Sequence, residues 1–275
     1  HIYDFGHQGV ESTIELLERH NIMHFGLNNK ALTLDDAKIA LHGYCCYSTN
    51  PYGLDVGVNK LNIDTVSKNL TNYHQNGYLN IVSIHAGLEH VNFPAYHDIQ
   101  MARQFSQICP YVYYGHHPHV LQGIEKVDDS LLAYSLGNFC FDDVYTNKSS
   151  QPLVKQNVNN KSSVILELEV VDGKLIEHLV TDLFMADDRL AIGTKDIELK
   201  LQQYTDFLST DESEYCQHRN SLLTKYIEGR KSMRNLKWYI KRLNYRSAII
   251  LMRAKYNTWQ HKKNVLEKIS ARSGR

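Results

Sequence analysis

The sequence lacks long apolar runs, and no segment of its 275 residues approaches the ~20 apolar residues that a membrane-spanning helix needs. It has only 5 prolines and 15 glycines, and 43% of its residues are hydrophobic. This composition excludes a collagen, a low-complexity chain and a disordered protein. The sequence also lacks an initiator methionine and a signal peptide, since it opens on His1, so we expect a fragment or a processed product.

The cysteines lack the spacing of a disulfide framework. There are 5 of them, an odd number, and Cys45 and Cys46 are adjacent. Neighbouring residues of a strand project to opposite faces, so these two are poor disulfide partners. Reduced thiols are typical of a reducing compartment, and they favour the cytoplasm. A peripheral membrane location is the alternative, and it depends on the basic charge of residues 225–275.

The chain also lacks net charge, but its charges are unevenly distributed. Residues 225–275 carry 15 Lys and Arg with 2 Asp and Glu, whereas residues 1–224 carry 15 and 28. The sequence therefore predicts an acidic body with a basic C-terminal part. Such a basic part suits an anionic membrane face, an acidic polymer or a nucleic acid, and nucleic acid has the least support because no reading motif accompanies the charge. The alternative is a helical hairpin that docks on the acidic body.

Helical and strand patterns alternate up to about residue 185, which is typical of a layered α/β domain. An Asp172-Gly173 pair between two β-rich runs then indicates a hairpin, because this turn needs positive φ angles. We expect a long loop at 143–162. The expected helices are 10–20, 64–76 (capped by Asp64 and ended by Gly77) and 95–108, and the expected strands are 39–47, 78–84, 111–114 and 131–134.

The pattern changes to helix alone after Thr194, with helices expected at 197–208 and from Leu222 towards the end. We place a domain boundary near residue 190, between an α/β domain at 1–190 and a basic helical extension at 191–275. Trp238, Tyr239 and Trp259 would suit a helix that lies in a membrane interface.

Histidines gather in the first half of the chain, where 12 of 15 lie at or before His119. Three belong to Gly115-His116-His117-Pro118-His119, which directly follows an expected strand. Ligands of open α/β sheets bind at such strand ends. Metal or phosphate binding explains three imidazoles in four residues better than a solvated polar loop does.

Three further segments are weaker taken alone. His85-Ala86-Gly87-Leu88-Glu89-His90 also follows a buried strand, and offers a histidine ligand and an acid–base carboxylate. A surface loop explains it equally well until it is paired with the first cluster. The other two are His1 with Asp4 at the start, which alone reads as a frayed end, and Ser135-Leu136-Gly137-Asn138-Phe139, which alone reads as a glycine turn with an asparagine cap.

In this order the segments resemble the CapA family, the bacterial capsule or poly-γ-glutamate synthesis proteins of the calcineurin-like metallophosphatase superfamily. The resemblance covers about residues 1–185. Its most specific parts are the GHHPH and YSLGNF signatures. The matching segments are Asp4-x-Gly6, His85-x-Gly87-x-Glu89, Gly115-His116-His117-Pro118-His119-Val120 and Ala133-Tyr134-Ser135-Leu136-Gly137-Asn138-Phe139.

The resemblance implies a four-layer αββα metallophosphatase-like sandwich, incomplete at the N-terminus, with a C-terminal helical extension. It also implies divalent metal ions, whether manganese, iron, zinc or magnesium, at one sheet edge. By the same resemblance, His85, His117 and His119 are metal ligands, with His116 in place of His117 if the loop is shifted by one. His1, Asp4 and Glu89 are then catalytic, and Asn138 and Ser135 line the substrate pocket.

Two departures from the family pattern limit these expectations. Ala86 replaces a family tryptophan. The superfamily's first two metal-binding motifs lie upstream of the position matched by His1, so the bridging carboxylate is missing from this sequence. We therefore expect the fragment to bind one metal weakly and to lack turnover.

For the full-length protein the resemblance implies a metal-dependent hydrolase acting on a phosphoester or an anionic capsule polymer. The alternative is a non-catalytic accessory protein. Its basic residues 225–275 would bind anionic polymer, a membrane surface or a synthase partner.

Overall fold

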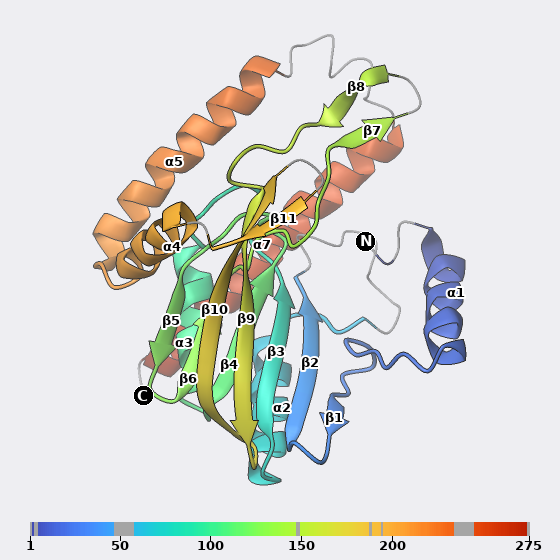
Figure 1. Cartoon of the computed structure of the whole chain (residues 1–275), viewed down its shortest axis with the longest axis vertical. Helices are drawn as coiled ribbons and strands as arrows, with labels where there is room; N and C mark the ends of the chain where they lie inside the picture. The colour runs from blue at the N-terminus through green and yellow to red at the C-terminus, as the bar shows by residue number, and fades with distance from the viewer. Residues whose placement is uncertain are drawn as a thin grey trace.

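Two β-sheets lie face to face, with helices over the outer face of the larger one (Figure 1). The computed structural model describes residues 2, 5–46, 58–146, 149–186, 189–193, 195–233 and 245–273. The expected site residues His1 and Asp4, and the aromatic residues Trp238 and Tyr239, lie outside these ranges.

The larger sheet has six strands in the order β1-β2-β3-β4-β6-β5. Its central strands run parallel, while the edge strands β1 and β5 are antiparallel to their neighbours. The interior strand β3 is buried along most of its length because both faces of the sheet are covered. The strands are β1 (Leu32–Leu34), β2 (Ile39–Cys45), β3 (Leu79–His85), β4 (Tyr111–His116), β5 (Ile124–Val127) and β6 (Ser130–Ala133).

Helices α2 (Ile63–Gln75) and α3 (Tyr96–Ser106) are the crossovers that keep β2, β3 and β4 parallel. The N-cap of α2 is Asn62, whose side-chain oxygen accepts the Thr65 N–H at 3.0 Å. The prediction of Asp64 as the cap was wrong by two positions, and Asp64 lies in the first turn of the helix. Gly77, with φ of 82°, follows the helix as expected.

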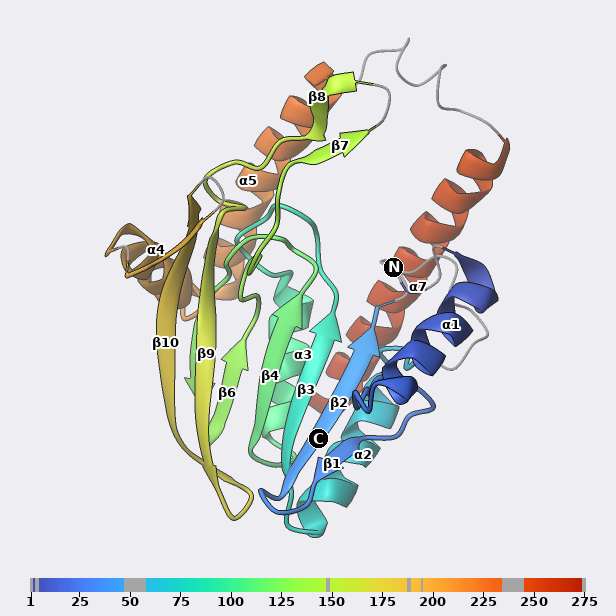
Figure 2. The same ribbon diagram turned by 45° about the vertical axis from the view of Figure 1, so that its right-hand side comes forward.

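The smaller sheet consists of β9 (Ser162–Val171), β10 (Lys174–Ala186) and β11 (Arg189–Ile192). Asp172 (φ 48°) and Gly173 (φ 73°) form the β9–β10 turn that the sequence predicts. Val164 and Leu166 on its inner face pack against Val112 of the larger sheet in one apolar cluster. Figure 2 shows α4 beside the β10 edge, and no other described helix over the outer face of this sheet.

The remaining helices are α1 (Gly6–Arg19), α4 (Lys195–Phe207), α5 (Glu212–Met233) and α7 (Tyr245–Ser273). Tyr215 of α5 is fully buried, and its hydroxyl donates to the Pro94 carbonyl at 2.9 Å. The C-terminal part of α7 packs against α3 through Val265 and Ile269. None of the described helices is apolar over a sufficient length to cross a bilayer.

The segment expected to be a long loop contains a short hairpin instead. Its strands are β7 (Val144–Thr146) and β8 (Ser149–Val154). The prediction missed it because the segment is rich in Asn, Ser and Lys rather than in β-branched residues. The expected fold class is confirmed as mixed α/β with two sheets and C-terminal helices, while the domain boundary near residue 190 stays a prediction.

Candidate metal centre

Strands β3 and β4 bring the two histidine segments to the same end of the larger sheet. The strands are parallel neighbours, and their register places His85 beside His116 at their carboxyl ends. The preceding position of β4 requires a glycine, because a Cβ on Gly115 would lie 1.9 Å from the carbonyl oxygen of Tyr134, the residue that follows β6. The sheet topology therefore produces the juxtaposition that the sequence suggested.

The loops after β3 and β4 are joined by backbone hydrogen bonds. The His90 N–H donates to the Pro118 carbonyl at 2.7 Å, and the Ala86 N–H donates to the His116 carbonyl at 3.2 Å. His90, His117 and His119 have φ angles of 62°, 97° and 59°. This left-handed region is unfavourable for residues with a Cβ, so the surrounding contacts hold strained backbone in place.

Glu89, His117 and His119 form the potential metal-ligand group among the described residues. Their ligand atoms all lie within 4.8 Å of one another, and each residue is partly buried. Glu89 and His117 therefore come from different loops yet reach a common centre.

Two asparagines hold His119 in place. The Asn138 amide nitrogen donates to the Asn160 carbonyl at 3.1 Å, which orients the Asn138 oxygen towards His119 Nδ1 at 2.9 Å. His119 Nδ1 is thus the donor, and the ring lone pair lies on Nε2. The Asn160 amide also donates to the His119 carbonyl and to His90 Nδ1, both at 2.9 Å.

His85 and His116 lie beside this group as a hydrogen-bonded pair. Their Nδ1 atoms are 3.0 Å apart, and His116 Nε2 lies 3.0 Å from the Ser83 hydroxyl. Both ring nitrogens of His116 are therefore engaged. The His85 ring packs on His117, with centroids 4.7 Å apart.

The environment keeps these imidazoles neutral. Burial, together with the neighbouring histidines, lowers the pKa of His85 to about 3. Burial also lowers the pKa of His117 to about 4, although the Glu89 carboxylate partly opposes this shift, and burial lowers the pKa of His116 as well. Neutral imidazole is the form that binds metals, so protons compete little with a cation at neutral pH.

The donor set fits one divalent cation. One carboxylate and two imidazoles leave coordination positions open, as in catalytic metal sites, and suit zinc, manganese or iron. Two cations about 4 Å apart need a bridging carboxylate. The described residues offer no second carboxylate in this ligand group.

The sequence carries the signature of a known family over the part that contains this centre. The profile of the family described as bacterial capsule synthesis protein PGA_cap matches residues 1–143, just over half of the chain. The chain belongs to the PGA_cap family.

Two curated proteins are similar to this PGA_cap family member. "Capsule biosynthesis protein CapA" of Bacillus anthracis is 26% identical over 184 residues, which cover 61% of this chain and 44% of that protein. "PGA biosynthesis protein CapA" of Bacillus subtilis (strain 168) is 27% identical over 187 residues, covering 62% and 48%. The chain therefore spans about half the length of these relatives.

The structure brings most of the predicted site residues of this family member together, but not all of them. Glu89, His117 and His119 share one ligand group. Asn138 is hydrogen-bonded to His119, and the pair His85 and His116 lies beside the group. Ser135 is only 1% exposed, and its hydroxyl accepts the Gly137 N–H at 3.4 Å, so its side chain shapes the turn.

Sequence reasoning missed Asn160 and Phe141. Asn160 lies in an Asn-rich segment that resembles an ordinary loop, and only the fold brings it to His119. Phe141 packs against His119, with ring centroids 5.2 Å apart. No spacing rule connects either residue to the histidine motifs, so the sequence held no signal for them.

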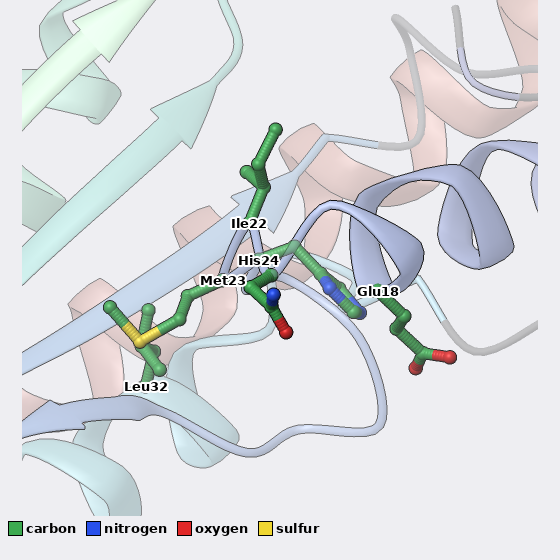
Figure 3. Close-up of a pocket in the computed structure, with 6 residues that line it drawn as sticks. Glu18, Ile22, Met23, His24 and Leu32 are labelled. Carbon is green, nitrogen blue, oxygen red and sulfur yellow. The ribbon is translucent and has the colours of Figure 1, made fainter.

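A separate pocket of about 420 Å³ lies between the end of α1 and β1 (Figure 3). It is shallow and open, and Met23 and Leu32 form its apolar part. Glu18 and His24 are its ionisable groups, and neither belongs to the predicted site. The candidate metal ligands lie together at the ends of β3 and β4 instead.

Proposed function

We propose that this chain carries the metal centre of a divalent-metal-dependent hydrolase that acts in capsule or poly-γ-glutamate biosynthesis. The observation that carries the proposal is the convergence of Glu89, His117 and His119 within 4.8 Å at the strand ends. Membership of the PGA_cap family and the printed names of the two relatives support the biosynthetic context. The proposed substrate is a phosphoester or an anionic capsule polymer.

The residues of this chain would bind the cation and orient its histidine ligands. Glu89 and the two histidines would hold the cation, which when bound polarises a phosphoryl or acyl oxygen and lowers the pKa of a coordinated water. Asn138 fixes the tautomer of His119, so that Nε2 is presented as the ligand atom. We assign His85 as a further nitrogen ligand, because it packs on His117 and has a low pKa.

Calorimetric titration with manganese and with zinc tests the binding step. The wild-type chain should bind about one equivalent of metal. His117→Ala should lose binding, whereas His74→Ala, which removes an exposed histidine near the end of α2, should not. A wild-type chain that binds neither metal would contradict the proposal.

Hydrolysis is tested on a chain extended to the length of the relatives. Manganese-dependent cleavage of a generic phosphodiester that disappears in His117→Ala would support the enzyme. Metal binding without turnover would support the second candidate, an accessory protein that binds anionic polymer. This candidate is favoured by the lack of a second carboxylate in the ligand group of the described residues.

A further inference from the structure

Helix α7 carries an exposed apolar stripe that the metal centre does not use. Five large apolar side chains lie along one side, with exposed fractions from 41% for Ile249 to 64% for Met252. At 3.6 residues per turn their positions fall within an arc of about 100°. The stripe consists of Ile249, Met252, Tyr256, Trp259 and Leu266.

The opposite side of the same helix docks on the protein. Val265 and Ile269 are buried in the core where α7 packs against α3, and Lys268 forms an ion pair with Asp64 of α2. The Gln104 side chain of α3 donates to the Ile269 carbonyl at 3.5 Å. The stripe therefore faces outward because the other side is fixed by its packing.

The charge around the stripe is of one sign. Between Tyr245 and Leu266 the sequence has five Lys and Arg and no Asp or Glu. Lys255 and Lys262 are exposed and flank one border of the stripe, and Lys263 lies 5.5 Å from the centre of the Trp259 ring. Aromatic rings beside lysines are typical of helices that lie at a membrane interface.

We propose that α7 docks this protein on an anionic lipid bilayer, with the stripe in the headgroup region and the lysines against the lipid phosphates. A second copy of the chain is a poorer occupant, because two such helices would bring like charges together without acidic residues to pair them. The apolar side chains exposed on β10 are a poorer lipid surface, because Glu167, Glu169 and Glu177 lie exposed among them.

The position of α7 gives this docking a consequence for the site. In both views the N-terminal half of α7 extends beyond the ends of β2 and β3, the end of the molecule that carries the metal centre (Figures 1 and 2). A protein docked through α7 keeps this end close to the lipid surface. The inference does not depend on whether the centre hydrolyses anything.

Co-sedimentation of the full chain with vesicles tests the proposal. The chain should bind phosphatidylcholine vesicles with about a quarter phosphatidylglycerol, and bind pure phosphatidylcholine at least about tenfold more weakly. Raising the salt from about 0.1 M to about 1 M should weaken binding to the anionic vesicles.

A charge-matched pair of variants locates the binding surface. Met252→Glu with Trp259→Glu should reduce binding to the anionic vesicles at least about tenfold. Ile192→Glu with Leu199→Glu makes the same charge change at exposed positions of β11 and α4 and should retain binding. Equal binding by the two double variants, or no binding by the wild-type chain, would overturn the proposal.

Fluorescence and sedimentation velocity distinguish lipid docking from self-association. In a Trp238→Phe background Trp259 is the remaining tryptophan. Its emission should shift to shorter wavelength with anionic vesicles and be quenched by brominated lipid. A dimer that Met252→Glu with Trp259→Glu dissociates, with no shift on adding vesicles, would show that the stripe pairs two copies instead.

Discussion

Asn138 connects the metal centre to the loop that follows β8, since its side-chain oxygen accepts a hydrogen bond from His119 Nδ1 and its amide nitrogen donates to the Asn160 carbonyl. Asn138→Ala removes the acceptor that fixes the His119 tautomer. We expect manganese affinity to fall about 10- to 100-fold, as for other residues that orient metal ligands. Calorimetry measures this change. Asn138→Asp keeps an oxygen facing Nδ1 and should retain more affinity than the alanine variant, and equal affinities in the two would contradict the orienting role.

His42 makes folding stability depend on pH. It is 2% exposed, and its Nε2 lies 2.8 Å from the Asn80 side-chain oxygen. Burial lowers the pKa of His42 from 6.5 to about 4, so the folded state binds a proton less readily than the unfolded chain. Stability from this residue is therefore present above pH ~6.5 and is lost as the pH falls towards ~4.

The predicted difference is between wild type and His42→Gln. Between pH 7 and pH 5 the free energy of unfolding of the wild type should fall by about 2 kcal/mol more than that of the variant. Urea unfolding at the two pH values measures it. The other buried histidines titrate in both proteins, so a parallel loss in the two would show that His42 is not responsible.

At the residue scale, contiguous motifs were enough to predict that the histidine segments lie together, while the roles of their residues stay predictions. His117 and His119 lie on one loop, and Glu89 follows a strand whose end could be inferred. Asn160 could not be found, because its role depends on the hydrogen bond to His119 across 41 positions of the chain. The hydrogen bonds of both His116 ring nitrogens could not be found either, because they arise from the strand register.

At the element scale, the docking of α7 rests on few side chains. Ile269 is 6% exposed and packs in the main core, whereas Leu266, three positions earlier, is 43% exposed. Ile269→Ala should lower the free energy of unfolding by about 2–4 kcal/mol or release α7 locally. Hydrogen exchange of the α7 amides reports both outcomes. Leu266→Ala should leave exchange nearly unchanged, and similar exchange in the two variants would contradict the docking.

Elements with strong periodicity were predicted, and those with weak propensity were not. Strands β3 and β4 are rich in aliphatic and aromatic residues, and Gly77 follows the end of α2. The β7–β8 hairpin is polar, and the four residues of β5 include the charged Glu125 and Lys126, so neither carries the apolar signal of a buried strand. The predicted cap of α2 was two positions too late, because Asn62 and Asp64 are both good N-cap residues and only tertiary context decides between them.

At the scale of the whole molecule, Gly173 joins the two sheets at the end opposite the metal centre. The β9–β10 turn packs on the end of α2 so closely that a Cβ on Gly173 would lie 2.2 Å from the Gly77 carbonyl oxygen. Gly193 has a similar φ, 78° against 73°, but has no atom within 4 Å of such a Cβ. The two glycines thus share a left-handed φ and differ in their contacts.

Alanine at each position separates these effects. Gly173→Ala should lower the free energy of unfolding by about 1–3 kcal/mol more than Gly193→Ala, because only the former forces the sheets apart. Urea denaturation monitored by near-ultraviolet circular dichroism measures the difference. Equal losses would mean that the turn does not hold the sheets together.

Most of the basic charge described on α7 does not contact the acidic body. The basic C-terminal part meets the acidic body at Lys268 and Asp64, yet the stripe on α7 and its lysines face away from that contact. The sequence shows the net charge of each part, but not which side of α7 faces the solvent. The exposed side is decided by which side of α7 packs against the core.

The left-handed backbone at His117 sets two kinds of selection against each other. Glycine would relax a φ of 97° and so stabilise the fold, but it would delete one imidazole of the candidate ligand group. A lineage that keeps histidine here for metal binding therefore also keeps the lower folding stability that this φ angle causes. Lineages that abandon the chemistry gain stability by drifting to glycine, so the residue at this position would record which course a descendant has taken.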